Sequence, residues 1–468
     1  MGIIMQKQVS EKITLLALLS AFFLVFVTVS LHRYWQYAVW YYDFGIFYQA
    51  ISAVSQLQPP IIDHYVFTDK NILGDHFHPI IFLISPFMAL FKGGEVLLLF
   101  QTLFVTLSGI FVYLIAKEIL KNKFEAFCIL VIYFSFIGLH NALITEFHEI
   151  VLLPLPLTIF LYGMVKKHFR WYVLGLAGIL LTKETVFFIP VWFGLLIAVK
   201  NKGLWRKIGL ATVFGSILYS LLIIFMVIPA INGEGYYYLS DTSAKNASLS
   251  FFDQLTLKSI VKTLLSFGFL PLLSPETVGP VLFNWLLRIL RFGNFDLGMH
   301  YNAEIAPTLI LGTAYGYRRL KKIILTKVKR IPNEYFKYAL LFLAIFSLIF
   351  STQILKSPAL LFTNKAFYQN TKNHEFLDRL IQHIPEDGVV MAQTNIAAKL
   401  AYRKVYFLRE NYSDFNPDYI VIDARKGQEP NNFLGIKNYE ALIKTLEIDP
   451  NYTVLYKQGD QRIYKKVN

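Results

Sequence analysis

Acidic and imidazole side chains gather in residues 41–79 of the chain. This segment reads Tyr-Tyr-Asp-Phe-Gly-Ile-Phe-Tyr-Gln-Ala from position 41 and Leu-Gly-Asp-His-Phe-His-Pro from position 73. Its carboxylates and imidazoles are those of Asp43, Asp63, His64, Asp69, Asp75, His76 and His78. Such groups can move protons or bind cations, and near a bilayer they are usually functional because burying them in lipid is costly. We interpret the segment as the wall of an active site at one membrane surface.

The Asp-His-Phe-His-Pro motif can also bind a metal ion. The residue before a proline is held extended, so alternation places His76 and His78 on one side of the backbone. Two imidazoles and the Asp75 carboxylate could hold a divalent cation, which is the only cofactor that the sequence suggests. The alternative is that these side chains form hydrogen bonds at the level of the lipid headgroups.

Similar groups recur in three later segments, and each has a structural alternative. Glu146 and Glu149 either act on a substrate or complement the positive end of a helix. Lys183 could pair with a phosphate or reach along the bilayer surface, and Asp43 could simply cap a helix. The candidate substrate-binding residues are His76, His78, His148, Lys183, Glu184, His300 and Glu304, the last two being one helical turn apart.

The composition identifies the elements that must position these groups. Of the 468 residues, 55% are hydrophobic and 16% are charged, whereas soluble domains carry about 25% charged residues. This is typical of a polytopic α-helical membrane protein. The net charge of +14 comes largely from Lys and Arg clusters between apolar segments, at 117–123, 166–170, 200–207 and 318–330. We therefore expect membrane lipids as neighbours, and no nucleic acid.

Apolar segments predict about eleven crossings of the plasma membrane. Lys7 and Lys12 precede the first span, 13–31, and place the N-terminus in the cytoplasm. Residues 43–57 have the spacing of an amphipathic helix that lies along the interface. Residues 171–199 are too short for two full spans, so we expect a hairpin with Lys183 near its outer tip. Counting crossings then places every candidate residue on the outer side.

The composition changes after Lys356. Short strand and helix patterns alternate there, and Gly459-Asp460 predicts a tight turn. We expect a transmembrane domain over 1–355, with its outer loop at 33–95, and a small extracytoplasmic α/β domain over 356–468. The second domain has no phosphate-binding loop or nucleophile motif, so a supporting or acceptor-binding role is expected.

The motifs and their order resemble one family over residues 12–425. Asp43–Gln49, Gly74–Pro79, Glu146–His148, Lys183–Glu184 and His300–Pro307 follow the pattern of the membrane family called domain of unknown function 2079. The chain departs from that pattern at Glu149 and Thr185. The family resembles a branch of the GT-C glycosyltransferase superfamily.

This resemblance implies a GT-C-like fold and an activity. GT-C enzymes transfer a sugar from a polyprenyl-phosphate carrier to an acceptor outside the cytoplasm, and we expect inversion at the anomeric carbon. Asp43 becomes the candidate general base, with Asp75 and Glu146 as further catalytic candidates. The alternatives are a transporter or lipid flippase, and an inactive GT-C-like scaffold; the sugar and the acceptor stay open.

Overall fold

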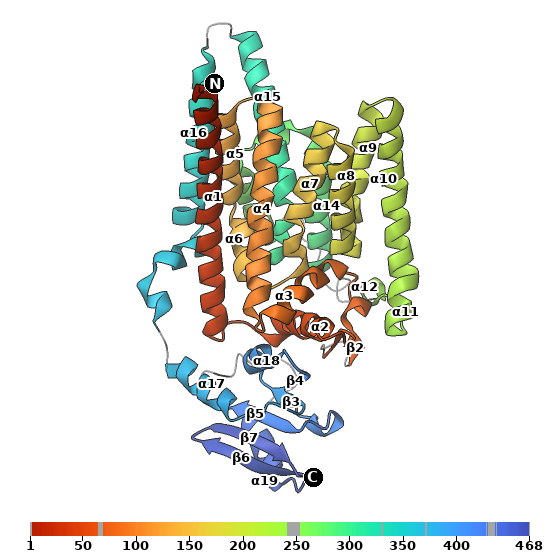
Figure 1. Ribbon diagram of the computed structural model, residues 1–468, viewed down its shortest axis with the longest axis vertical. Helices are drawn as coiled ribbons and strands as arrows, with labels where there is room; N and C mark the ends of the chain where they lie inside the picture. Colours follow the sequence, from red (N-terminus) through yellow and green to blue (C-terminus); the bar gives the residue numbers. More distant parts are fainter. Residues whose placement is uncertain are drawn as a thin grey trace.

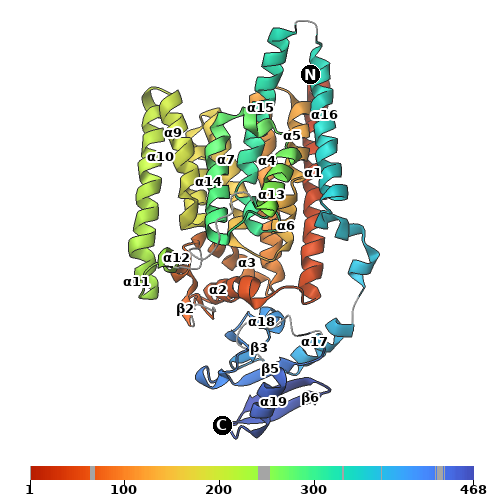
Figure 2. The same ribbon diagram turned by 180° about the vertical axis from the view of Figure 1, so that it is seen from behind.

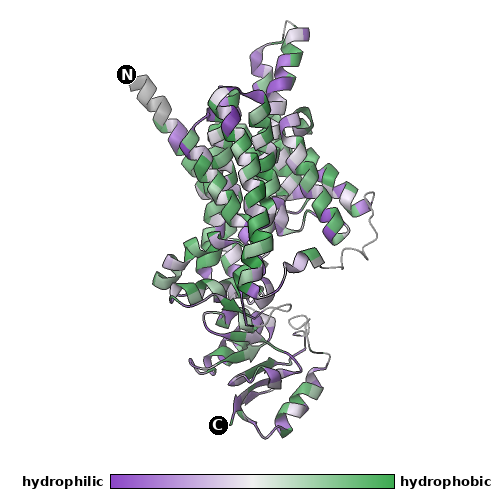
Figure 3. Ribbon diagram, turned by 90° about the vertical axis from the view of Figure 1, so that its right-hand side faces the viewer, coloured by the Kyte–Doolittle hydropathy of each residue, from purple (hydrophilic) through white to green (hydrophobic). Residues whose placement is uncertain are grey.

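The computed structural model describes residues 2–63, 69–240, 253–328, 331–369, 372–426, 428, 436 and 438–467. A bundle of long helices runs along the vertical axis of Figure 1, and a small sheet lies below one end of it. The N-terminus lies toward the other end of the bundle, and the reverse view in Figure 2 shows the same arrangement. Figure 3 shows that hydrophobic residues dominate the middle of the bundle, whereas polar residues gather at its ends and around the sheet.

The helical part ends near residue 354. Its α-helices are α1 (Gly2–Trp35), α2 (Ile46–Ser55), α3 (Ser85–Leu90), α4 (Glu95–Leu120), α5 (Lys123–Phe134), α6 (Ile137–Ile144), α7 (Pro154–Lys166), α8 (Phe169–Thr182), α9 (Phe188–Lys200), α10 (Gly203–Leu222), α11 (Ile228–Asn232), α12 (Tyr237–Ser240), α13 (Gln254–Ser266), α14 (Pro275–Phe292), α15 (Ala306–Lys327) and α16 (Asn333–Ile349).

Five stretches of helix are long and apolar enough to cross a membrane alone. They are Val9–Trp35, Glu95–Leu120, Glu149–Lys166, Gly203–Asn232 and Asn333–Ile354 within the described residues. The pair α5 and α6, bent by 48°, would make a sixth span. This is fewer than the eleven crossings expected from the sequence, because several of the other apolar segments form shorter or more polar helices.

The hairpin predicted over 171–199 is one of these shorter elements. Helices α8 and α9 have 14 and 13 residues, or about 20 Å each at 1.5 Å per residue, against a hydrocarbon thickness of about 30 Å. The backbone turns extended at Lys183, with φ −168° and ψ 141°, and the short 3-10 helix η5 (Glu184–Phe187) follows. The hairpin therefore delivers Lys183 and Glu184 to the interior of one end of the bundle.

The predicted outer loop lies between the bundle and the sheet (Figure 1). It contains a π-helical turn η1 (Tyr41–Gly45), helix α2, a two-stranded ribbon of β1 (Ile61–Ile62) and β2 (Lys70–Asn71), and the 3-10 helices η2 (Ile72–Gly74) and η3 (Pro79–Ile84). Pro79 occupies the first turn of η3, where its missing N–H costs nothing. Residues 46–52 of α2 are all buried by the surrounding protein. The C-terminal part contributes to the core around this loop.

The C-terminal part combines parallel and antiparallel strands, as expected. Its elements are α17 (Lys372–Gln382), β3 (Val390–Ala392), α18 (Thr394–Leu400), β4 (Val405–Phe407), β5 (Tyr419–Asp423), α19 (Tyr439–Ile448), β6 (Tyr452–Gln458) and β7 (Gln461–Lys466). The strand order is β4-β3-β5-β7-β6. Strands β4, β3 and β5 are parallel, whereas β7 pairs antiparallel with β5 and β6. The polypeptide therefore crosses from β3 to β4 through α18, which lies nearest the bundle (Figure 2).

Candidate active site

Asp43 lies on the π-helical turn η1, which directly follows an extended residue, Trp40. A side chain at Gly45 would collide with the ring of Tyr41, so the tight turn requires glycine there. The side chain of Asp43 is 38% exposed, and its carboxylate lies 3.5 Å from Nε2 of His148. Among the candidate carboxylates, Asp43 is therefore presented at the surface of the site without being tied to a cation.

Glu146 supports this turn from behind. It is buried, and its Oε2 accepts a hydrogen bond of 3.1 Å from the backbone N–H of Phe44. Burial, followed by the charge of Asp43, raises the pKa of Glu146 well above its ordinary value. The backbone of Glu146 has φ +106°, a conformation that costs energy in a residue with a side chain. The Glu146 carboxylate therefore holds the backbone of η1 beside Asp43.

The strained loop at Glu146 is anchored by Gln101 of α4, which the sequence analysis did not select. Gln101 Nε2 donates to the carbonyl of Glu146 at 2.7 Å, and Gln101 Oε1 accepts from the backbone N–H of His148 at 2.9 Å. The side chain is fully buried. The sequence does contain a signal for this role: a glutamine within a largely apolar span needs polar partners for its amide, so it indicates a buried polar contact.

His148 and His300 meet in a stacked pair whose ring centroids are 3.5 Å apart. Burial and the neighbouring His148 hold the pKa of His300 well below its ordinary value, so it is neutral near pH 7. Within the described part of the chain, neither ring nitrogen of His148 makes a hydrogen bond. The pair joins His148, which directly precedes the 3-10 helix η4 (Glu149–Leu152), to His300, the first residue of η9 (His300–Ala303), and it leaves polar atoms beside Asp43 that a substrate could engage.

Lys183 and Glu184 point to different partners. Lys183 Nζ lies 2.7 Å from Glu149 Oε1, and both side chains are buried. Burial alone would lower the pKa of Lys183, but the Glu149 carboxylate raises it above the ordinary lysine value. The lysine is therefore a permanent cation in the interior of the site.

Glu184 holds the Asp-His-Phe-His motif in place. Its carboxylate lies 2.7 Å from His76 Nδ1, accepts the backbone N–H of Phe77 at 2.8 Å and accepts the Tyr236 hydroxyl at 2.5 Å. Burial opposes ionisation, but His76, Lys183 and Tyr236 together keep the pKa of Glu184 near 2. A carboxylate with these partners anchors a loop and is not available as a base.

The metal site expected from Asp75, His76 and His78 is not formed. Asp75 accepts from the Tyr238 hydroxyl at 2.9 Å, His76 pairs with Glu184, and the ring of His78 lies 5.5 Å from that of Phe47. Across the described residues, no three His, Cys, Asp or Glu side chains are grouped so that they could hold a metal ion. Asp75, His76 and His78 do not converge on one point because each contacts a different element: α12, η5 and α2, respectively.

Asp63 and Asp69, which the sequence analysis grouped with the site, contact the C-terminal part instead. Asp63 pairs with Arg409 at 2.6 Å and Asp69 pairs with Lys404 at 2.9 Å. His64 lies outside the described residues. His300 and Glu304 also do not pair, because Glu304 lies 3.1 Å from Arg288 and accepts from Asn284.

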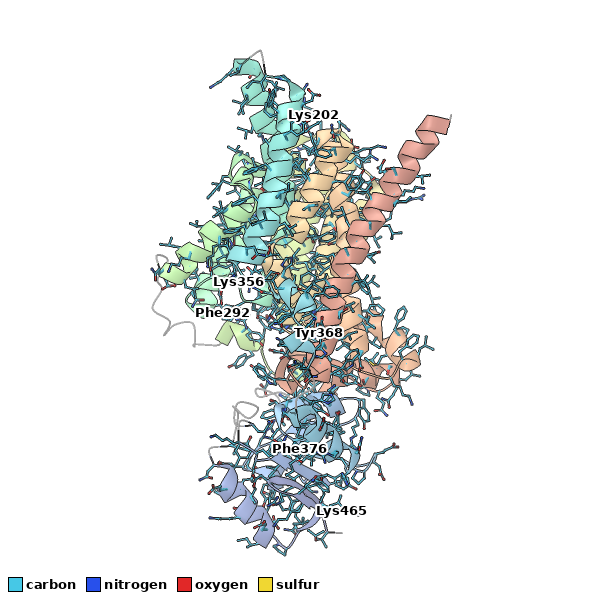
Figure 4. The ribbon with its side chains drawn as sticks, turned by 90° about the vertical axis from the view of Figure 1, so that its left-hand side faces the viewer. Lys202, Phe292, Lys356, Tyr368, Phe376 and Lys465 are labelled. Atoms are coloured by element: carbon cyan, nitrogen blue, oxygen red, sulfur yellow. The ribbon has the colours of Figure 1, made fainter. Side chains whose placement is uncertain are left out.

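A pocket of about 390 Å³ opens beside these pairs. Its polar wall includes Lys183, Arg288, Arg291 and Glu304, and its apolar wall includes Phe188, Leu287, Leu290 and Phe292. Figure 4 shows Phe292 toward the end of the bundle that faces the C-terminal part, and Lys202 at the opposite end. Cations beside an apolar wall can hold a phosphate together with a hydrocarbon chain.

Arg288 and Arg291 were missed because they lie in the apolar run 281–292. The guanidinium of Arg288 stacks 3.8 Å from the ring centroid of Tyr301, and that of Arg291 lies 4.5 Å from that of Tyr238. Two arginines three residues apart within an apolar helix are a signal in themselves, since such charges are costly without a role. Tyr301 also links this pocket to Asp43, because its ring contacts that of His300 at 4.0 Å.

Comparisons with known proteins agree with this architecture. A family model described as a predicted membrane protein (DUF2079) matches residues 33–461, and no curated protein matches the chain significantly. The crystal structure of ArnT from Cupriavidus metallidurans bound to undecaprenyl phosphate superposes with a TM-score of 0.52 at 12% identity, covering 97% of this chain and 98% of that one. The apo structure of ArnT gives 0.47 at 14% identity, covering 96% and 98%. The superposition on the lipid-bound structure shows that the two chains share the GT-C fold.

Proposed function

We propose that this chain, which belongs to the DUF2079 family of membrane proteins, is a glycosyltransferase that uses a polyprenyl-phosphate-linked sugar. One observation carries the proposal. A partly exposed carboxylate, Asp43, is joined through His148, His300 and Tyr301 to a pocket that has both cations and an apolar wall. A base beside a lipid-phosphate pocket is the pair of features that this transfer requires.

The pocket is assigned to the carrier lipid. Lys183, Arg288 and Arg291 would neutralise its phosphate, and the apolar side chains of α14 would contact the first isoprene units. Arg291 is exposed, so its guanidinium can reach an incoming lipid. The structural neighbour ArnT has been crystallised with undecaprenyl phosphate, which supports a lipid of this class.

Asp43 is assigned the role of general base. It would accept the proton of the acceptor hydroxyl while the acceptor oxygen forms a bond to the anomeric carbon of the sugar. The bond from that carbon to the phosphate oxygen breaks, and the lipid phosphate leaves with the electron pair. Attack opposite to the leaving group inverts the anomeric centre.

The surrounding groups would serve this step without exchanging protons. Phosphate is a good leaving group, so no general acid is needed, and the fixed cations stabilise the charge that develops on it. His148 and His78 would face the sugar. Glu146 and Asp75 would hold the backbone of η1 and the 75–78 loop.

We further propose how the protein is oriented in the membrane and which domain performs the chemistry. The N-terminus would be cytoplasmic and the C-terminal domain, 356–468, extracytoplasmic, with the chemistry contained in residues 1–355. The basic cluster around Lys202 supports this orientation, since it lies at the end of the bundle opposite the sheet (Figure 4).

The first test is binding of polyprenyl phosphate to the detergent-purified protein, measured by native mass spectrometry. Arg291→Gln should weaken binding by about 10- to 150-fold, because a charge-assisted contact contributes about 1.5–3 kcal/mol. Lys202→Gln is the matched control, an exposed cation at the other end of the bundle, and should leave binding unchanged. If the wild-type protein does not bind the lipid, or if both variants lose binding equally, the proposed function is wrong.

A further inference from the structure

We propose that the C-terminal part of the chain is a positioning element for the transfer site, with Arg409 as its central residue. In this role, which rests on the proposed function, helix α18 and the segment 405–409 hold the turn η1 in the conformation that presents Asp43. The C-terminal part would supply no catalytic group, and its removal would inactivate the site without touching the lipid pocket.

The apolar side of η1 is completed by α18. Tyr41 and Phe44 are both fully buried, and they share one core with Ile396, Ala397 and Leu400. Helix α18 is in direct contact with η1. Without the C-terminal part, two aromatic rings of the turn would lose part of their packing, which is the main force that holds a short irregular element in place.

A series of hydrogen bonds connects the turn η1 to Arg409. The hydroxyl of Tyr41 donates to Gln49 at 2.7 Å and accepts the backbone N–H of Asp63 at 3.3 Å. The Asp63 carboxylate is contacted by Arg409 at 2.6 and 2.7 Å and by the backbone N–H of Phe407 at 3.2 Å. Arg409 therefore acts on η1 through Asp63 and Tyr41.

Arg409 is itself held in a defined orientation. Its guanidinium lies 3.9 Å from the ring centroid of Phe407 and 4.1 Å from that of Phe415. Two flanking rings and a buried carboxylate leave this planar group little freedom, and a lysine could not reproduce the stacking of a guanidinium on the two rings. Through this arrangement, Arg409 covers the part of the outer loop that contains Asp63, although the two residues lie far apart in the sequence.

Contacts on the other flank of η1 restrain the end of α1. Tyr37 donates to Asp378 at 2.6 Å, and the Lys399 ammonium lies 3.5 Å from the ring centroid of Tyr34. The turn that carries Asp43 is thus bracketed by the C-terminal part both before residue 41 and after residue 49. Asp43 itself faces His148, away from these contacts.

The experiment compares three single variants of the full-length protein. Arg409→Gln removes the ion pair with Asp63, and Arg409→Lys keeps the charge but loses the stacking on Phe407 and Phe415. Lys404→Gln is the control because it removes a half-exposed cation from the same interface. Hydrogen exchange of the peptide covering 41–49 reports directly on η1. Transfer rate and polyprenyl-phosphate binding are measured on the same samples.

In Arg409→Gln we expect exchange in 41–49 to rise about tenfold and the turnover rate to fall about 100-fold, with lipid binding unchanged. Arg409→Lys should lie between this variant and the wild type, and Lys404→Gln should match the wild type. If Arg409→Gln does not fold, the test is whether Arg409→Lys shows the intermediate hydrogen exchange and turnover rate that we expect of it.

Unchanged exchange in 41–49, or normal turnover with raised exchange, would overturn the positioning role. The exchange measurement does not depend on the reaction. If wild-type protein neither binds the lipid nor transfers a sugar, the proposed function fails, whereas exchange still shows whether Arg409 holds the turn.

Discussion

Two groups of ionisable side chains flank η1, and they differ in how many of their polar atoms have hydrogen-bond partners. Toward the C-terminal part, the Asp63 carboxylate is saturated by Arg409 and a backbone N–H. Toward the pocket, Asp43 is 38% exposed and, in the described residues, the nitrogens of His148 and His78 have no hydrogen-bond partner. Buried polar groups are normally paired. The closed group therefore stabilises the fold, and the open group is the one that a substrate would complete.

The largest effect should follow from removing the open carboxylate. Asp43→Asn keeps the shape of the side chain but cannot accept the proton, so we expect transfer to fall by about 10²–10⁴-fold. Lipid binding and thermal stability should not change, because Asp43 holds neither the lipid nor the turn. Activity close to wild type would assign the base to another residue.

Breaking a closed pair within the site should cost stability as well as function. Lys183→Met leaves the buried Glu149 carboxylate without its cation, and we expect a loss of about 3–5 kcal/mol in unfolding free energy. The double variant Lys183→Met/Glu149→Leu should recover stability, as measured by the thermal unfolding midpoint, but not lipid binding. Recovery of both would show that Lys183 is structural only.

The open imidazoles predict an acid sensitivity. Burial lowers the pKa of His78 to about 4, below its ordinary value of about 6.5. The unfolded chain therefore binds this proton first, and the folded state loses up to about 3 kcal/mol as the pH falls from about 6.5 to 4. His78→Phe removes the titration and keeps a ring, so its thermal midpoint should depend less on pH over this range. An unaltered pH profile would contradict the neutral, buried state of His78.

The smallest effect should come from the half-exposed pair on the closed side. Asp69 and Lys404 have side chains that are 45% and 47% exposed, and such pairs contribute less than about 1 kcal/mol. Asp69→Asn should shift the thermal midpoint little, whereas Asp63→Asn on the same interface should shift it several times more. Equal shifts would remove the distinction between the two aspartates.

Hydrophobic runs predicted most of the elements. Helices α8 and α9 form the predicted hairpin with Lys183 between them. The extent of α2 was predicted but its surroundings were not. Its pattern is amphipathic, and only the tertiary structure shows that residues 46–52 are all buried within the protein.

The site was harder to predict than the fold because residue type does not identify a partner. Asp43 and Asp63 belong to the same loop, yet only Asp63 meets a cation, which lies 346 positions later in the chain. His300 and Glu304 have the spacing of a helical pair, but a 3-10 turn over His300–Ala303 separates them. Arg288 and Arg291 stayed hidden in an apolar run, since averaging hydropathy along a span conceals single charges.

The pairing of Asp63 with Arg409 also sets the order in which the molecule can be completed. Synthesis proceeds from the N-terminus, so η1 is made hundreds of residues before the α18 helix that covers it, and contacts of such long range form late. During this interval the aromatic rings of the turn lack their cover. On the proposed function, the base would be in place only after residues 394–409 have packed against η1, and a chain that ends before them would have the lipid pocket without a positioned base.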